Sequence, residues 1–146
     1  MTTLFENILV PFDSSSIANR AFKNALEIAD PNSSKVTIVT VVTGIYQPSI
    51  GFSMKYSKEL LEQHTKMLKK IFSKLDSIAK NKGIKLTLKI LFDPSVSRAI
   101  LNYMDSTKFD LVVIGSHGRT GINKIILGSV ANDIVHKSKC PVMVVK

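Results

Sequence analysis

Residues 111–137 read LVVIGSHGRTGINKIILGSVANDIVHK. They contain, in order, an apolar run, a glycine-rich stretch and a segment with the pattern of a helix. The branched apolar run at 111–114 predicts a buried strand, and Ser129–Lys137 predicts a helix. Between them lie four of the chain's seven glycines, which permit unusual φ angles and close backbone approach. The stretch therefore predicts a strand–loop–helix unit whose loop is either a set of tight turns or a ligand site.

The alternation of strand and helix continues outward through the whole chain. Apolar or alternating runs predict four more strands, at 7–12, 36–42, Lys85–Phe92 and Val142–Val145. Three more helices are predicted: one after DSSS at 13–16, one spanning 61–78 and closed by Gly83, and one from Asp93-Pro94-Ser95 to about Tyr103. Residues 44–57, rich in serine with Pro48 and Gly51, are predicted to form a mobile surface loop.

This element order predicts an α/β fold. Strands that are apolar on both faces require helices on both sides, and right-handed crossovers then give a single doubly wound parallel sheet of five strands. The 146 residues are interpreted as one domain, 1–146. No long uncharged apolar stretch or basic leader is present, and Cys140 is the only cysteine. These features favour a cytoplasmic protein without a membrane span or an internal disulfide.

The formal net charge of +9 is unevenly distributed. Ten of the seventeen lysines lie between Lys55 and Lys89, and the chain has only three arginines. Nucleic-acid surfaces more often combine arginine and aromatic side chains, so a nucleic-acid partner is disfavoured. The lysine-rich helix is interpreted as a solvated face, with an acidic partner as the alternative.

The glycine loop follows the fourth strand, at the sheet edge where doubly wound proteins bind ligands. Gly115 and Gly118 free the loop for close approach, and Ser129 is a candidate N-cap whose hydroxyl and neighbouring N–H groups could meet an anion. The chain has no GxxxxGK[ST] motif, no GxGxxG after the first strand and no GxSxG. A polyphosphate site of another kind is therefore predicted, and glycines needed only for turns are the alternative.

Several segments resemble the universal stress protein family over essentially the whole chain. They are NILVPFD, GSHGRTG, ILGSVA and CPVMVV, with Gly115, Gly118, Gly128 and Ser129 in the spacing G-x2-G-x9-G-[ST]. The resemblance implies an adenine-nucleotide alpha-hydrolase-like fold with strand order 3-2-1-4-5. It also implies a stress-response regulator or nucleotide-dependent switch that binds ATP, with Mg²⁺ or Mn²⁺ held through the phosphates.

The resemblance assigns roles residue by residue. Pro11 and Asp13 would lie beside the nucleoside, the backbone of Val41 would contact adenine, and Gly115 would approach the ribose. The phosphates would be surrounded by Gly118, Gly128, Ser129 and Val130. No catalytic residue and no protein metal ligand is implied. Antiparallel pairing of Val142–Val145 with its copy would form a homodimer, and an additional protein partner is left open.

Two positions depart from the family pattern, and other functions stay open. Ser14 and Phe92 stand where the family often has glycine, and Ser14 is expected to narrow the pocket. His64 and His117 are interpreted as a boundary and a loop residue, whereas Arg119 is a candidate for steering phosphates. One alternative function is a slow ATPase or phosphoryl-transfer enzyme. The other is a nucleotide-free module that binds an acidic partner through its basic helix.

Overall fold

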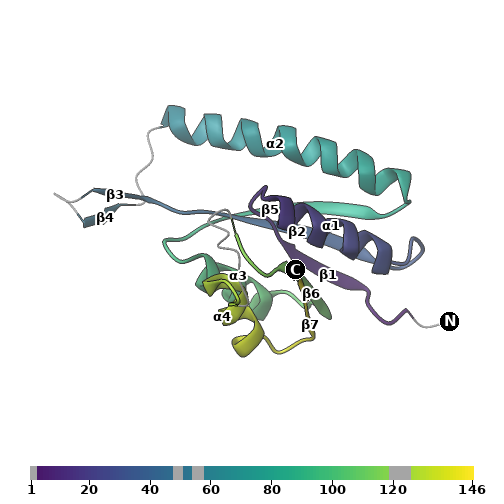
Figure 1. The fold of residues 1–146 in the computed structure, drawn as a ribbon. Helices are drawn as coiled ribbons and strands as arrows, with labels where there is room; N and C mark the ends of the chain where they lie inside the picture. The colour runs from purple at the N-terminus through teal and green to yellow at the C-terminus, as the bar shows by residue number, and fades with distance from the viewer. Residues whose placement is uncertain (1–2, 48–50, 54–57, 119–125) are drawn as a thin grey trace.

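The five predicted strands form one parallel sheet (Figure 1). The structure, a computed structural model, describes residues 3–47, 51–53, 58–118 and 126–146. The strand order is β5-β2-β1-β6-β7, which confirms the order 3-2-1-4-5. Its strands are β1 (Asn7–Pro11), β2 (Lys35–Val42), β5 (Lys85–Phe92), β6 (Leu111–Gly115) and β7 (Val142–Val145). The α/β fold class inferred from the sequence is therefore confirmed.

Two layers of helix cover the sheet, one on each face (Figure 1). Helices α1 (Ser16–Ile28) and α2 (Lys58–Asn81) pack on one side, and α3 (Val96–Ser106) and α4 (Ser129–Lys137) on the other. Period-two alternation divides β1 between the two cores: Ile8 and Val10 join the α1/α2 side, and Leu9 joins the α3/α4 side. Burial on both faces explains why the central strands are continuously apolar.

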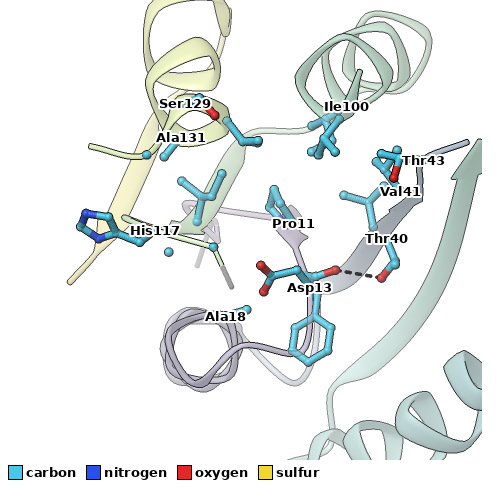
Figure 2. A pocket seen from close by; sticks show the side chains of 18 of the residues that line it. Pro11, Asp13, Ala18, Thr40, Val41, Thr43, Ile100, His117, Ser129 and Ala131 are labelled. Carbon is cyan, nitrogen blue, oxygen red and sulfur yellow. Dashed lines mark hydrogen bonds between the residues drawn. The ribbon is translucent and has the colours of Figure 1, made fainter. Parts of the chain in front are cut away.

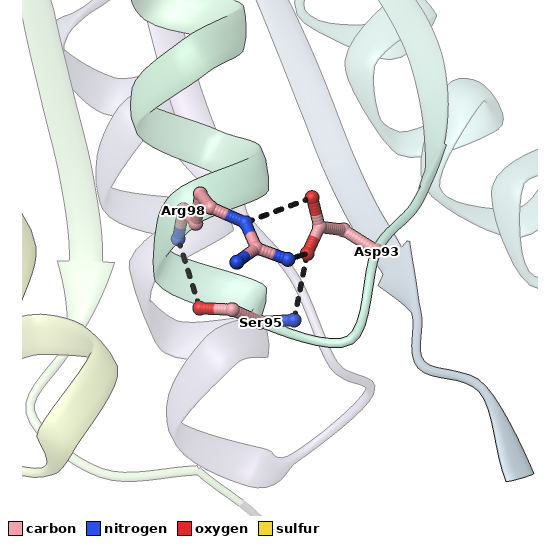
Figure 3. Close-up of polar contacts among 3 residues, drawn as sticks. All are labelled: Asp93, Ser95 and Arg98. Atoms are coloured by element: carbon pink, nitrogen blue, oxygen red, sulfur yellow. Dashed lines mark hydrogen bonds and ion pairs between the residues drawn. The ribbon is translucent and has the colours of Figure 1, made fainter. Parts of the chain in front are cut away.

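Capping residues set where two helices begin. The Ser15 hydroxyl accepts from the Ala18 N–H at 3.1 Å, so the DSSS segment caps α1 as predicted. Ser95 caps α3 in the same way, accepting from the Arg98 N–H at 3.3 Å (Figure 3). The Arg98 guanidinium also donates from Nη2 to Asp93 Oδ1 at 2.5 Å and from Nε to Oδ2 at 3.3 Å. These hydrogen bonds from Arg98, with one from the Ser95 N–H, hold the pKa of the Asp93 carboxyl below its ordinary value.

The expectation of an irregular loop at 44–57 is wrong for the part that the structure describes. Strands β3 (Ile45–Gln47) and β4 (Gly51–Ser53) form an antiparallel hairpin that stands away from the main sheet in Figure 1. Isoleucine, tyrosine and phenylalanine in these strands have high β propensity, which explains why the pairing forms locally. Residues 48–50 and 54–57, with Pro48 and Lys55 among them, lie outside the described residues.

Other boundaries shift by a few residues. Helix α2 begins three residues before and ends three residues after the predicted 61–78, and β1 stops at Pro11 instead of residue 12. Gly83, with φ of +72°, donates its N–H to the Lys80 carbonyl at 2.9 Å and closes α2 as expected. Among the described residues, no helix combines the length and the apolar character that crossing a membrane requires.

Ser14 adopts a backbone conformation that suits glycine. Its φ is +68°, and it is the only described residue other than glycine with a positive φ. Here the chain turns between β1 and α1, and the Asp13 carboxylate accepts from the Ser15 N–H at 3.0 Å. A left-handed conformation is unfavourable for a residue with a Cβ. The glycine often found here in the resembled family thus has a conformational explanation.

We expect Ser14→Gly to stabilise the protein. Relief of the left-handed strain is offset in part by the greater freedom of glycine in the unfolded chain, which leaves a gain of about 0.5–1 kcal/mol. Urea denaturation would measure it. Ser16→Gly, inside the first turn of α1, is the matched control and should give no gain. An unchanged or reduced midpoint for Ser14→Gly would contradict this account.

Candidate functional site

A cavity of about 630 Å³ opens at the carboxyl ends of β1, β2 and β6 (Figure 2). This is the edge of a doubly wound sheet at which ligands bind, since the connection after β1 runs to one face and the connection after the neighbouring β6 runs to the other. All eight residues assigned from the sequence line this one cavity: Pro11, Asp13, Val41, Gly115, Gly118, Gly128, Ser129 and Val130. The fold therefore brings together residues that are separated by more than a hundred positions in the chain.

At one end of the cavity, the backbone of Val41 faces the space beyond β1. The Val39 carbonyl accepts from the Phe12 N–H at 2.9 Å, whereas the Val42 carbonyl accepts from the Asp93 N–H at 3.2 Å on the opposite side. Because peptide groups alternate in direction along a strand, the N–H and C=O of Val41 point to the β1 side. The β1–β2 ladder ends at the pair Pro11 and Val39. Val41 thus presents a donor and an acceptor side by side at the cavity.

The Asp13 carboxylate lies between the start of α1 and the glycine loop. Its Oδ1 accepts from the Ser15 N–H, and its Oδ2 would be 3.0 Å from a Cβ placed on Gly118. In Figure 2 the carboxylate points away from Thr40 and toward the side on which His117 lies. Thr40 donates from its hydroxyl to the Phe12 carbonyl at 3.0 Å, the dashed line of Figure 2. Asp13 therefore lies close to the glycine loop as well as to the end of β1.

At the other end of the cavity, α4 begins without a side-chain cap. The expectation that Ser129 is the N-cap is wrong: Gly128 is the N-cap, because its carbonyl accepts the first helical hydrogen bond, from Asn132 N–H at 2.8 Å. Gly128 has no side chain to cap the helix, and the exposed Ser129 is the first helical residue. The N–H groups of Ser129, Val130 and Ala131 precede the first intrahelical donor, and all three residues line the cavity. In the described part of the chain these three donors have no hydrogen-bond acceptor, and together with the positive end of the helix dipole they have the geometry that anion binding requires.

The glycines of the loop serve different physical needs. A Cβ on Gly115 would lie 2.9 Å from the Ile17 side chain, so glycine here lets α1 pack on β6. A Cβ on Gly128 would lie 3.0 Å from the Ser116 carbonyl oxygen, which accepts from the Gly128 N–H at 2.7 Å. Of the three described glycines of the loop, only Gly118 is exposed, and a side-chain oxygen of Asp13 is the one atom that a Cβ on Gly118 would meet. Its lack of a side chain keeps the cavity side of the loop open.

Residues of helices α2 and α3 form part of the cavity wall, which was not predicted from the sequence. His64, Met67 and Leu68 of α2 and Val96 and Ile100 of α3 also line the cavity. His64 and Leu68 belong to an apolar stripe with helical spacing, but such a stripe cannot distinguish a cavity wall from a core contact. His64 was interpreted as a boundary residue and is half-buried at this wall.

The remaining polar candidates are placed as follows. His117 lies with its Nδ1 2.9 Å from the Ser116 hydroxyl. Ser14 and Phe92 are absent from the residues that line the cavity, so the expected narrowing by Ser14 is wrong. Arg119 lies outside the described residues. In the described part of the chain, no cluster of three or more His, Cys, Asp or Glu residues could hold a metal ion.

Comparison with known proteins agrees with this architecture. The model of the universal stress protein family matches residues 4–146. The chain is 31% identical to universal stress protein MJ0531 of Methanocaldococcus jannaschii, over 98% of this chain and 83% of that protein. The chain belongs to the universal stress protein family. The recognition of this family from the glycine spacing and the flanking motifs is therefore confirmed.

Solved structures of universal stress proteins share the fold. The structure of the hypothetical protein MJ0577 superimposes with a TM-score of 0.81 at 26% identity, covering 98% of this chain and 96% of that one. A universal stress protein from Archaeoglobus fulgidus, solved in complex with dAMP, superimposes with a TM-score of 0.68 at 23% identity, covering 98% and 99%. The second comparison supports the fold, and its ligand is a property of that protein.

Proposed function

We propose that this universal stress protein binds ATP in the cavity and acts as a regulator or nucleotide-dependent switch in the cytoplasm. The observation that carries the proposal is that one cavity has a peptide donor–acceptor pair at one end and an uncapped helix N-terminus at the other. The first feature suits a nucleobase edge, and the second suits phosphate. The dAMP complex of the Archaeoglobus fulgidus relative supports an adenine nucleotide as the ligand class.

The backbone of Val41 favours adenine over guanine. Adenine presents a ring-nitrogen acceptor next to its exocyclic amine donor, whereas guanine presents a carbonyl acceptor where adenine has that amine. The N–H of Val41 would donate to the ring nitrogen, and its C=O would accept from the amine. With guanine two acceptors would face each other at the Val41 carbonyl, leaving a polar group without a partner. Val41, Pro11 and Asp13 would thus hold the nucleoside, with Gly115 next to the ribose.

The phosphates would lie between the glycine loop and the start of α4. Gly118, Gly128, Ser129 and Val130 line the cavity near this point, and the two glycines bring no side chain into it. Since the described residues provide no metal cluster, we propose that Mg²⁺ is held through the phosphates, where it would offset their charge. Single-turnover measurements compared with nucleotide release would distinguish the binding protein proposed here from a slow ATPase.

We expect Gly118→Val to weaken ATP binding about tenfold or more, since the new side chain fills the open side of the loop. The change is compatible with folding, because Gly118 is exposed and its φ is not in the left-handed region. Isothermal titration calorimetry with Mg²⁺ and ATP would measure the affinity. Gly51→Val in β4, outside the glycine loop, is the matched control and should bind normally. Equal affinity of Gly118→Val and wild type would refute the site.

The start of α4 permits a direct test of its backbone donor. Ser129→Pro removes one N–H at the first helical position, where proline is favoured. Gly128, with φ of −60° and ψ of 157°, already has the conformation that a residue before proline requires. We expect ATP affinity to fall about tenfold or more, the loss of one charge-assisted hydrogen bond. Ser129→Ala keeps the N–H and should change affinity only a few-fold. If the proline variant binds as tightly as the alanine variant, this N–H does not hold the phosphates.

We also propose that the protein is a homodimer formed by β7. This strand is at the end of the sheet, where an unpaired edge invites pairing with another strand. The Pro141 carbonyl accepts from the Val112 N–H at 3.0 Å, and the Val145 carbonyl accepts from the Ser116 N–H at 2.8 Å. By alternation, Val142 and Val144 direct their peptide groups to the open edge. Antiparallel pairing with a second β7 would satisfy these groups in an isologous contact.

We expect Val144→Pro to give a monomer in light scattering at micromolar concentration. Proline removes the edge-facing N–H of Val144 while the hydrogen bonds from β7 to β6 are retained. Val144→Thr keeps both the N–H and the β-branched shape, so it should stay dimeric. A dimer that persists in Val144→Pro, or a wild-type monomer, would contradict this interface.

A further inference from the structure

The outer face of α2 carries a row of four exposed lysines, Lys66, Lys69, Lys70 and Lys74, here called the lysine face. In the described part of the chain none of them makes an ion pair. The next two lysines along the chain differ, because Lys80 pairs with Asp76 and Lys82 pairs with Glu27. The lysine face is therefore a concentration of positive charge that the protein itself does not compensate.

The spacing of these lysines has an energetic consequence for the helix. Lys66, Lys70 and Lys74 follow one another at i, i+4, and Lys69 lies three residues after Lys66. Such positions are neighbours on a helix surface, where like charges destabilise the helix. The row extends about 12 Å along the axis. A local conflict of this kind, retained on an exposed face, is typical of a surface that meets an opposite charge.

The rest of α2 holds this face in a defined orientation. Leu75 and Ala79 are buried, and Ile71 and Phe72 pack against the same core. Figure 1 shows α2 on the outside of the sheet, on the side that it shares with α1, and the four lysines of the lysine face are exposed. Because the apolar side of α2 is occupied by the core, α2 cannot insert that side into a membrane while the domain stays folded.

We propose that the lysine face docks an acidic segment of a partner protein, a run of Asp and Glu residues with helical spacing. The charges are complementary, and a row of amines one helical turn apart matches carboxylates repeated at the same interval. Between Lys66 and Lys74 the other exposed positions hold Met67 and Ser73, and none holds an arginine or an aromatic residue. The guanidinium forks and stacking rings that strengthen nucleic-acid binding are therefore missing from this face. The lysine face ends toward the N-terminus of α2 at two exposed acidic residues, Glu59 and Glu62.

The test uses the full chain and a defined probe, a fluorescein-labelled peptide of glutamate and alanine that is about 20 residues long, or about 30 Å as a helix. Fluorescence anisotropy would compare wild type with Lys66→Gln/Lys69→Gln/Lys70→Gln/Lys74→Gln. The control set is Lys35→Gln/Lys85→Gln/Lys108→Gln/Lys146→Gln, four exposed lysines elsewhere that also make no ion pair in the described chain. Each set removes four positive charges from the net charge of +9, and glutamine preserves helix propensity.

We expect the lysine-face variant to bind the peptide about tenfold more weakly than wild type, and the control variant to lose no more than about threefold. The wild-type affinity should fall as salt increases. No measurable peptide binding by wild type, or an equal loss in both variants, would overturn the proposal. It would also be overturned if a DNA duplex or phosphatidylserine vesicles bound the lysine face more tightly than the peptide. None of these outcomes depends on ATP, so failure here leaves the nucleotide proposal intact.

Discussion

The hydrogen bond from the Gly128 N–H to the Ser116 carbonyl organises the site, because it joins the two ends of the glycine loop. At 2.7 Å it brings the first turn of α4 against the residue that follows β6. A Cβ at Gly128 would lie 3.0 Å from the same oxygen, so no other residue permits this approach without a shift of the backbone. The three free N–H groups of α4 lie at the cavity because this closure places them there. The glycine is thus required by backbone contact even before a ligand is considered.

Much of the fold could be predicted because its signals are local. The continuously apolar strands and the helix at Ser129–Lys137 follow from short-range patterns. The strand order was implied by the family resemblance, and the structure confirms it. The cap of α4 could not be predicted with equal certainty. Serine is a common N-cap, but which carbonyl accepts the first helical hydrogen bond depends on where the Ser116 contact holds the chain. The contribution of α2 to the cavity wall could not be predicted for a related reason. An apolar stripe on a helix does not indicate which part of the sheet the helix will cover.

The net positive charge of this protein and the groups proposed to contact a phosphate are different features of the molecule. The positive net charge produces a field that attracts anions toward the protein at long range and is weakened by salt. In the described cavity wall, however, the proposed phosphate site relies on neutral backbone N–H groups, and Asp13 contributes a carboxylate beside them. Selectivity for a phosphorylated ligand would then depend on the direction of fixed dipoles, which salt screens far less than exposed lysines. The lysine face on α2 can accordingly serve a different ligand.

Helix α2 connects the two proposed binding surfaces. Its inner side places His64, Met67 and Leu68 in the cavity wall, and its outer side carries the lysine face. A nucleotide that touches the inner side and an acidic segment bound to the outer side would both favour the same packed position of α2. Were α2 also to occupy a second position, each ligand that binds only the packed one would stabilise it by mass action, and the two ligands would bind with positive coupling. Thermodynamic linkage makes that coupling reciprocal: the factor by which ATP strengthens docking must equal the factor by which docking strengthens ATP binding. A switch that used this helix would therefore need no residue that contacts both ligands, because a shift of α2 would transmit the effect.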